Sequence, residues 1–247
     1  MATSSLPTNS HRTQRKSVGM QISDEGLKVT APLRLPFEAL EEALLQRGRW
    51  ILTRLSAWQQ SQARMLAPAD LLACGLPVPL FGKPHAVVYE ASLKKGFINT
   101  DTQSIHLPCA APHNNGLDSG TTPCQNNASR ALEKLLRPLA LQTFQQQAER
   151  LRSRASLPHY TVHLSSAKCR WGSCNCRREL RLNWRLVFYS RAIIEYVVAH
   201  EMAHLLEMNH SARFWATVEQ LAPDYLRAHQ YLSDKNPEKV PLYQAAD

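Results

Sequence analysis

Apolar residues recur at helical spacing over two long stretches of the chain. Residues 37–59 predict a helix whose apolar stripe is Leu40, Leu44, Leu45, Ile51, Leu52 and Leu55. Residues 128–153 predict another, interrupted near Pro138. Residues 160–164 and 179–188 alternate apolar and polar side chains, as strands do. Further short stretches predict strands, most of them in hairpins: 27–31, 78–81, 86–90, 97–99 and 104–107. The pattern therefore predicts an α+β protein.

A third helical stretch is apolar on nearly every side but carries His200, Glu201 and His204. Each helical residue turns the chain by about 100°, so the two histidines at this H-E-x-x-H spacing share one face. The flanking residues are Ile193, Ile194, Val197, Val198, Met202, Leu205 and Leu206. Chance histidines on a solvated helix are the alternative interpretation. The apolar flanks favour a metal site, because unpartnered polar groups are costly to bury.

His210 is the best candidate for a third ligand. On a continuous helix it would lie about 9 Å further along the axis than His204, too far to share an ion. The sequence therefore predicts a break between them. Asn209 favours this break, because asparagine readily takes the left-handed conformation that ends helices. Ser211 is then placed to cap a new helix over residues 212–218 and turn His210 toward the metal.

These residue types favour zinc and a hydrolytic reaction. Neutral imidazole is a preferred zinc ligand, and catalytic zinc sites usually combine three protein ligands with a water. Zinc lowers the pKa of that water to roughly 7, and Glu201 lies near enough to accept its proton as the water attacks a carbonyl. We therefore predict one Zn²⁺ per chain. His163 and Glu207 are the alternative third ligands.

The chain divides into four predicted parts. Residues 1–26 are polar and basic and predict a flexible tail, and residues 27–140 predict an N-terminal α+β region. That region contains a long loop near 108–127, rich in Pro, Asn, Gly, Ser and Thr. Residues 141–235 form the predicted zinc core, and residues 236–247 a C-terminal tail.

Composition bears on the compartment and on the cysteines. Of the 247 residues, 44% are hydrophobic, yet no apolar run is long enough to cross a bilayer. The N-terminus has no apolar signal segment, so we expect a cytoplasmic protein, no membrane partner and reduced thiols. Cys169, Cys174 and Cys176 cluster with the spacing C-x4-C-x-C. This spacing lacks paired C-x2-C knuckles, so ordinary thiols are favoured over a second metal site.

The net charge of +9 is unevenly distributed. In the segment 150–185, Glu179 stands alone against Arg150, Arg152, Arg154, Lys168, Arg170, Arg177, Arg178, Arg181 and Arg185. Such a basic segment is usually a solvated surface. It also suits an acidic substrate or nucleic acid, so nucleic acid is retained as a candidate partner.

Four motifs together resemble the YgjP-like, SprT-related zinc metallopeptidases. They are Lys168-x-Arg170-Trp171-Gly172-Ser173-Cys174, Leu182-Asn183-Trp184-Arg185-Leu186, Tyr196-Val197-Val198-Ala199-His200-Glu201-Met202-Ala203-His204-Leu205 and Asn209-His210-Ser211-x-x-Phe214-Trp215. The resemblance implies a zincin-like α+β fold, in which a small β-sheet packs on the buried H-E-x-x-H helix after an N-terminal α/β region. It also implies that His200, His204 and His210 bind zinc, with Glu201 as the catalytic carboxylate. Glu207 occupies the glycine position of the metzincins, so we exclude that group.

The favoured function is a zinc metallopeptidase acting on protein or peptide substrates, with the variant that these proteins are attached to DNA. The predicted strand 179–188 would lie beside the cleft and pair with an extended substrate. Asn183 and Arg185 on its polar face then become candidate substrate contacts, with a solvated face as the alternative. The competing functions are a non-catalytic zinc-stabilised module that binds nucleic acid or protein, and hydrolysis of a non-peptide amide.

Overall fold

The protein folds as two compact units, Met1–Ala63 and Arg64–Asp247. The computed structural model describes residues 8–13, 17–23, 26–62, 65–109, 123–233, 235, 237 and 240–241. Among these, no helix combines the length and apolar character that crossing a membrane requires. The division differs from the predicted boundary at residue 140. Helix α4 (Pro123–Arg152) runs through that position, and its apolar face belongs to one core with the segments before and after it.

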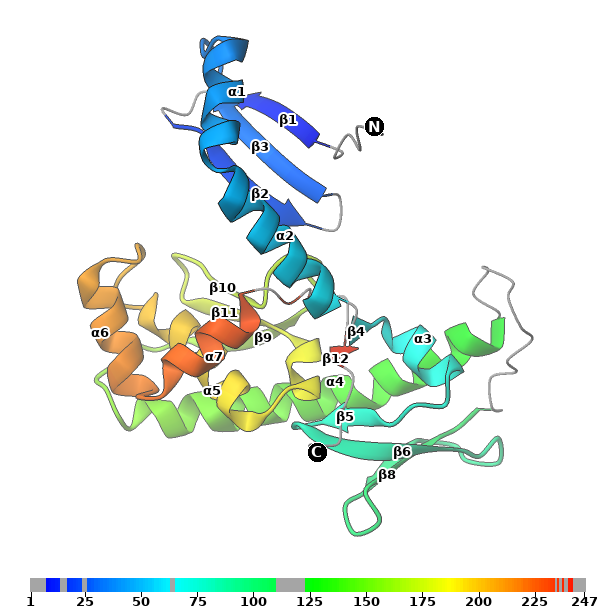
Figure 1. Ribbon diagram of the computed structural model, residues 1–247. Helices are drawn as coiled ribbons and strands as arrows, with labels where there is room; N and C mark the ends of the chain where they lie inside the picture. Colours follow the sequence, from blue (N-terminus) through cyan, green and yellow to red (C-terminus); the bar gives the residue numbers. More distant parts are fainter. Residues whose placement is uncertain are drawn as a thin grey trace, which may run out of the picture. The chain divides into compact units, whose positions relative to one another are not determined.

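The first unit is a three-stranded sheet with two helices (Figure 1). Its strands are β1 (Thr8–Thr13), β2 (Gly19–Ser23) and β3 (Gly26–Pro32), in the order β1-β3-β2. The central β3 pairs parallel with β1 and antiparallel with β2. Helices α1 (Phe37–Gln46) and α2 (Gly48–Gln62) complete the unit. Its small core consists of Leu27, Val29, Ala31, Leu40, Ile51 and Leu55.

Two expectations for this unit need correction. Residues 8–13 and 19–23, expected in a flexible tail over 1–26, form β1 and β2. The sequence of β1 is entirely polar, so no local hydrophobic pattern indicates its pairing with β3. Strand β2 pairs with the other side of β3, and its alternation is only five residues long. The single helix expected over 37–59 is divided at Arg47, the C-cap of α1, and α2 begins at Gly48, a poor helix former.

In the second unit, the described residues form three further small sheets. A four-stranded sheet has the order β5-β6-β8-β7, from β5 (Val78–Leu80), β6 (Lys83–Tyr89), β7 (Phe97–Asn99) and β8 (Ser104–Leu107). A three-stranded sheet has the order β10-β11-β9, from β9 (Thr161–Ser165), β10 (Gly172–Cys174) and β11 (Glu179–Asn183). The short strands β4 (Met65–Leu66) and β12 (Val240–Pro241) pair antiparallel. The two predicted hairpins, β5–β6 and β7–β8, are confirmed.

Helices α4 and α5 (Arg191–Ala203) form the centre of this unit. Helix α4 packs against α5, β9 and the 3₁₀ helix η1 (Trp184–Phe188) (Figure 1). It continues through Pro138 without the expected interruption, and it begins inside the predicted 108–127 loop. The rest of that loop, residues 110–122, lies outside the described residues. The remaining helices are α3 (Pro68–Ala73), α6 (Ala212–Leu221) and α7 (Tyr225–Leu232).

The strand expected over 179–188 ends at Asn183. There the Asn183 side chain accepts a hydrogen bond of 3.2 Å from the backbone N–H of Arg185 and begins η1. Trp184, Leu186, Val187 and Phe188 are all buried in this helix. A strand would have turned alternate residues outward, whereas the 3₁₀ helix lets this run of large side chains enter the core together.

Candidate metal centre

Helix α5 carries the H-E-x-x-H residues in a buried position. It begins after Ser190, whose side chain makes no capping hydrogen bond. Its buried residues are Ile193, Ile194, Tyr196, Val197, Val198, Ala199, Glu201, Met202 and Ala203. His200 and His204 are only partly exposed. This helix is therefore mostly buried, as its apolar sequence predicts.

The predicted break between His204 and His210 is present. Helix α5 ends at Ala203 with His204 as its C-cap, and α6 begins at Ala212. The Ser211 hydroxyl accepts a hydrogen bond of 3.3 Å from the N–H of Phe214, as an N-cap should. The mechanism expected for Asn209 is wrong, because its φ is not positive. Instead, its side-chain oxygen accepts a hydrogen bond of 3.2 Å from the N–H of Ser211 and shapes the turn.

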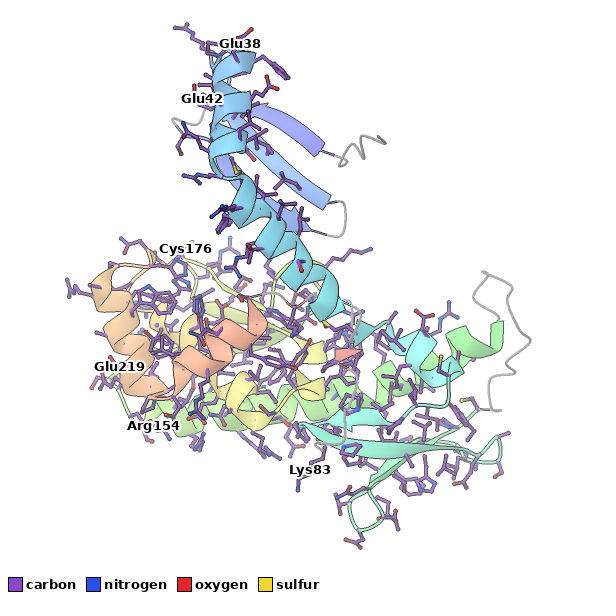
Figure 2. All side chains as sticks on the ribbon, viewed as in Figure 1. Glu38, Glu42, Lys83, Arg154, Cys176 and Glu219 are labelled. Atoms are coloured by element: carbon purple, nitrogen blue, oxygen red, sulfur yellow. The ribbon has the colours of Figure 1, made fainter. Side chains whose placement is uncertain are left out.

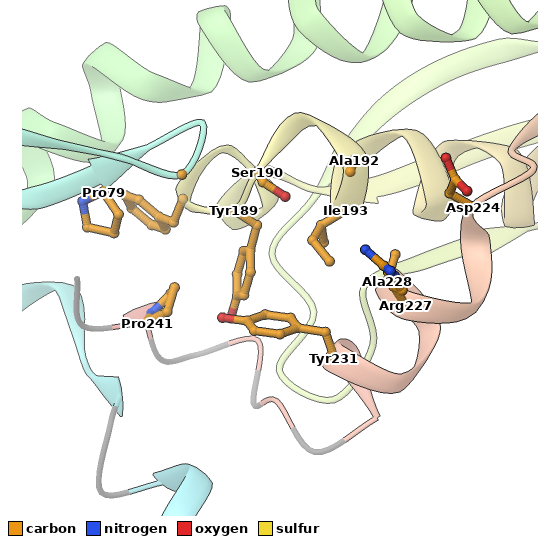
Figure 3. Close-up of a pocket in the computed structure, with 12 residues that line it drawn as sticks. Pro79, Tyr189, Ser190, Ala192, Ile193, Asp224, Arg227, Ala228, Tyr231 and Pro241 are labelled. Carbon is orange, nitrogen blue, oxygen red and sulfur yellow. The ribbon is translucent and has the colours of Figure 1, made fainter. Parts of the chain in front are cut away.

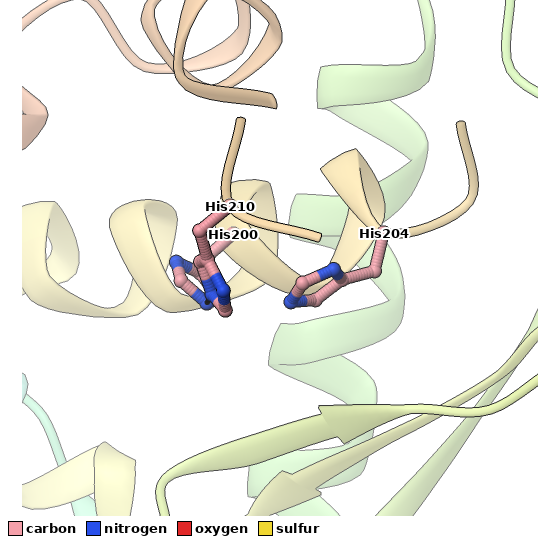
Figure 4. Close-up of side chains that lie close together, drawn as sticks. All are labelled: His200, His204 and His210. Carbon is pink, nitrogen blue, oxygen red and sulfur yellow. Dashed lines mark hydrogen bonds between the residues drawn. The ribbon is translucent and has the colours of Figure 1, made fainter. Parts of the chain in front are cut away.

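The turn brings three imidazoles together (Figure 4). One ring nitrogen each from His200, His204 and His210 lie within 4.8 Å of one another. The Nε2 atoms of His200 and His210 are 3.2 Å apart. Tetrahedral zinc with Zn–N bonds of about 2.0–2.1 Å separates two nitrogen ligands by about 3.3 Å. This spacing, and a donor set made only of imidazoles, fits a zinc ion held by the three residues.

The surroundings fix how the rings face. His204 Nδ1 lies 3.0 Å from the carbonyl oxygen of Glu207, which directs its Nε2 toward the other rings. The Phe214 ring packs against all three imidazoles, with centroid distances of 4.9, 4.6 and 4.6 Å. Nδ1 of His200 is buried without a hydrogen-bond partner within the described structure. The turn before α6 thus supplies the candidate ligand His210, and the first turn of α6 supplies Phe214 as an apolar base.

Burial favours the neutral forms of His200 and His204. It lowers the pKa of His200 to about 3, and the nearby His204, His210 and His229 lower it further. Burial also lowers the pKa of His204, although the Glu207 carbonyl opposes that shift. A neutral imidazole has a free nitrogen lone pair, so the site favours metal binding over protonation.

Glu201 is buried beside the histidines, with 5% of its surface exposed. Burial raises the pKa of its carboxyl to about 8, while Arg170 acts in the opposite direction. The carboxylate lies directly against β10, because a Cβ atom added at Gly172 would be 2.4 Å from Glu201 Oε1. Only glycine at position 172 leaves room for this side chain. Sequence reasoning assigned no role to Gly172, and the sole signal is its place in the Trp-Gly-Ser motif.

A cavity of about 260 Å³ opens beside Glu201 and His200. Its lining residues come from β10 and the residue before it, from α5, and from α7 and the residue after it: Trp171, Gly172, Tyr196, Val197, His200, Glu201, His229, Leu232 and Ser233. Within it the hydroxyl of Tyr196 and Nδ1 of His229 are 2.7 Å apart. Burial, with Glu201 as the next cause, raises the pKa of Tyr196 to about 12. His229 lies far along the chain from the histidine motif, so no sequence spacing indicated it.

A larger hollow of about 750 Å³ lies at the other end of α5 (Figure 3). Tyr189, Ile193, Arg227 and Tyr231 are among its lining residues. It includes neither Glu201 nor any of the three clustered histidines. Of the three clustered histidines, only His200 lines the smaller cavity, together with Glu201.

The two predicted substrate residues occupy unexpected positions. Asn183 is fully buried, and its amide donates to the carbonyl oxygens of Ala167 (2.8 Å) and Arg170 (3.3 Å). It therefore holds the segment before β10 in place and has no exposed surface for a substrate. Arg185 lies in η1 with its guanidinium 4.9 Å from the centroid of the Trp184 ring. The continuous strand that made both residues face a cleft is absent, so neither lines the cavity beside Glu201.

The other candidate ligands lie elsewhere. His163 is exposed on β9 and lies 3.0 Å from the Thr161 hydroxyl. The Glu207 carboxylate pairs with Arg213 at 3.2 Å. Cys169 and Cys176 are exposed and Cys174 is partly buried, all as free thiols. In the part of the chain that the structure describes, the three clustered histidines form the only group of candidate ligands close enough to share an ion.

Several charges of the basic 150–185 segment are paired. Arg150 and Arg154 both bind the carboxylate of Glu195, at 2.7 and 2.9 Å. Arg154 is labelled in Figure 2. Arg181 pairs with Glu179 at 3.2 Å, and Arg152 pairs with Glu149. Part of the apparent positive surface is therefore neutralised by contacts within the molecule.

The geometry defines a class of protein: a mixed α+β unit in which three histidines lie close enough together to hold a metal ion. The family model of the YgjP-like metallopeptidase domain matches residues 16–235, and the chain belongs to this family. Among solved structures, the chain is similar to the metallopeptidase zymogen abylysin of Pyrococcus abyssi. That similarity has 21% identity and a TM-score of 0.33, and covers 36% of this chain and 87% of the other. No curated protein matches the sequence.

Proposed function

We propose that this protein is a zinc-dependent metallopeptidase that hydrolyses peptide bonds in protein or peptide substrates. The observation that carries the proposal is the convergence of three imidazoles beside a buried glutamate. A structural zinc site has no need of such a carboxylate, whereas a hydrolytic site requires a base. Membership of a metallopeptidase-domain family supports the same conclusion.

His200, His204 and His210 would hold the ion, and their positions at the end of α5 and just before α6 support a zincin-like arrangement. When bound, zinc would acidify a water and polarise a carbonyl. Glu201 would accept the proton of the attacking water and pass it to the leaving amine. The carboxylate is buried in close contact with Gly172, and Glu201 lines the cavity.

The sheet provides an edge where an extended peptide would pair. Strand β11 lies between β10 and β9, so it is not available for the substrate pairing first expected of it. Within the described residues, β10 pairs only with β11, and its first residue, Gly172, lines the cavity. A peptide that added to the free edge of β10 would pass close to Glu201. The cavity would then receive one of its side chains.

Metal analysis and cleavage profiling test the proposal. We expect about one zinc per chain, cleavage of a peptide library, and loss of cleavage after zinc removal by a chelator. Glu201→Gln should retain zinc and lose at least about 10³-fold in kcat/KM. His163→Ala, at an exposed histidine outside the cluster, is the matched control and should behave as wild type. Zinc-loaded wild type without activity on any peptide would refute the proposal.

A non-catalytic zinc-stabilised module is the competing function, and the two differ in what Glu201→Gln changes. A module that binds nucleic acid or protein would keep its affinity in this variant, while the enzyme would lose its turnover.

The same cleavage assay with added DNA at several salt concentrations tests whether proteins attached to DNA are the substrates. The ion pairs of Arg150 and Arg154 leave less positive charge for that role than the sequence suggests. Simple amides in the same screen test hydrolysis of non-peptide bonds.

A further inference from the structure

Tyr196 and His229 form a hydrogen-bonded pair in the cavity beside Glu201, outside the three histidines that would hold the metal. Tyr196 lies on α5 one turn before His200, and its ring is nearly perpendicular to the His200 ring at 5.8 Å. His229 comes from α7. The 2.7 Å distance joins the phenol oxygen to Nδ1 of the imidazole. Both side chains line the same cavity as Glu201 and His200.

The pair leaves one proton available to a ligand. A neutral tyrosine and a neutral histidine hold two exchangeable protons between them, and their mutual hydrogen bond uses one. When the Tyr196 hydroxyl donates to Nδ1, the proton of the imidazole is on Nε2. In the described part of the chain, no group accepts a hydrogen bond from His229 Nε2. This N–H is therefore a free donor at the edge of the cavity.

Aromatic neighbours hold the His229 ring although the residue is exposed. Tyr196 and Trp215 approach it edge-on, with centroid distances of 5.8 and 5.4 Å. Tyr196 and Trp215 are in turn stacked on Tyr225, at 6.3 and 5.5 Å. A surface histidine without a role would rotate freely. Here two aromatic rings, those of Tyr196 and Trp215, and one hydrogen bond restrict it, so its donor is preorganised.

Resting on the proposed function, we propose that His229 donates a hydrogen bond from Nε2 to the carbonyl oxygen of the scissile peptide bond. Negative charge develops on that oxygen when water adds, and a preorganised donor stabilises it more in the transition state than in the bound substrate. Tyr196 is the positioning residue, because its hydroxyl keeps the proton of His229 on Nε2. The amide of Asn183 cannot serve, since it is buried and bound to two backbone carbonyls.

Kinetics of three variants test the proposal in the full chain loaded with zinc. His229→Ala should lower kcat by roughly 10²–10³-fold, with KM and zinc content near wild type. His229→Gln places an amide N–H near the former Nε2 and should recover part of the loss. Tyr196→Phe keeps the buried ring and should lower kcat by about tenfold. Gln230→Ala, at the exposed neighbouring residue on α7, is the control and should leave kcat unchanged.

A measurement without catalysis tests the pair directly. In metal-free protein with ¹⁵N-labelled histidine, the NMR shifts of His229 should show an unprotonated Nδ1 and a protonated Nε2. Tyr196→Phe should weaken this preference to that of a free histidine, whereas Gln230→Ala should preserve it. A wild-type His229 protonated on Nδ1 would overturn the proposal, since the donor would then face Tyr196.

The outcomes separate this proposal from the function on which it rests. If zinc-loaded wild type cleaves no peptide, the proposed function fails and the role of His229 fails with it. If wild type is active and His229→Ala keeps kcat within about threefold, only the role of His229 is refuted. The same follows if His229→Ala loses its zinc, or if KM alone changes, because neither effect is that of a donor acting in the transition state.

Discussion

Gly172 has no side chain, and the Glu201 carboxylate occupies the space that this leaves. We predict that Gly172→Ala lowers peptide cleavage by at least about tenfold and destabilises the fold by about 1–3 kcal/mol, because its Cβ would lie 2.4 Å from the Glu201 carboxylate. Zinc content should stay near wild type, since the three histidines do not move. Gly48→Ala is the control, because no atom lies within 4 Å of a Cβ there. Full activity in Gly172→Ala would contradict the close approach.

The raised pKa of Glu201 predicts how its replacement changes stability with pH. A carboxyl whose pKa rises on folding from 4.5 to about 8 binds its proton more tightly in the folded state. Its ionised form therefore destabilises the metal-free protein increasingly as pH rises between those values. Glu201→Gln lacks this penalty and should be more stable at pH 8 by roughly 1–5 kcal/mol, but nearly equal to wild type at pH 4.5.

Urea unfolding with a chelator present, at several pH values, measures that difference. Other titrating groups are common to both proteins and cancel in the comparison. A stability difference that is the same at pH 8 and pH 4.5 would contradict the assigned burial of Glu201.

Among single residues, the sequence predicts His200, Glu201 and His204, because the spacing that identifies them lies within one helical segment. It does not predict Gly172 or His229, since each meets the site only through the packing of another element. Asn183 shows the opposite error. A polar side chain in an alternating segment suggested a substrate contact, but its amide serves buried backbone carbonyls.

The start of helix α6 governs the position of the third histidine. Ser211 accepts a hydrogen bond from Phe214 N–H, so Ser211→Ala removes a real cap and should cost about 1 kcal/mol of stability. His210 directly precedes this cap, so zinc affinity should also fall severalfold. Ser190→Ala is the matched control, because Ser190 occupies the N-cap of α5 without a side-chain hydrogen bond. Calorimetric unfolding and zinc titration of the two variants decide the matter, and equal effects would contradict the prediction.

Long helices with a clear apolar period were predictable as elements, while short strands and element ends were not. Both α4 and α5 follow their apolar patterns. Strands β1 and β2 depend on pairing with β3, and the change from β11 to η1 depends on one side-chain hydrogen bond at Asn183. Such tertiary and capping effects override the local pattern of hydrophobic residues.

The described residues form two separate cores, and the residues of the candidate metal centre all lie in the second unit. The family match nevertheless includes most of the first unit. The predicted boundary at residue 140 cut through α4, because a long amphipathic helix gives no local sign of which segments share its core. The contacts place the division at Ala63, beyond the end of α2.

This division predicts that residues 64–247 fold and bind zinc without the first unit. We expect one cooperative unfolding transition and a zinc affinity within about threefold of the full chain, because the core and the ligands are retained. A chain of residues 68–247 is the matched control. It lacks β4, leaves the partner strand β12 with its buried Val240 unpaired, and should be less stable by about 1–3 kcal/mol. Non-cooperative unfolding of 64–247, or loss of its zinc, would show that the first unit is part of the structure that supports the metal centre.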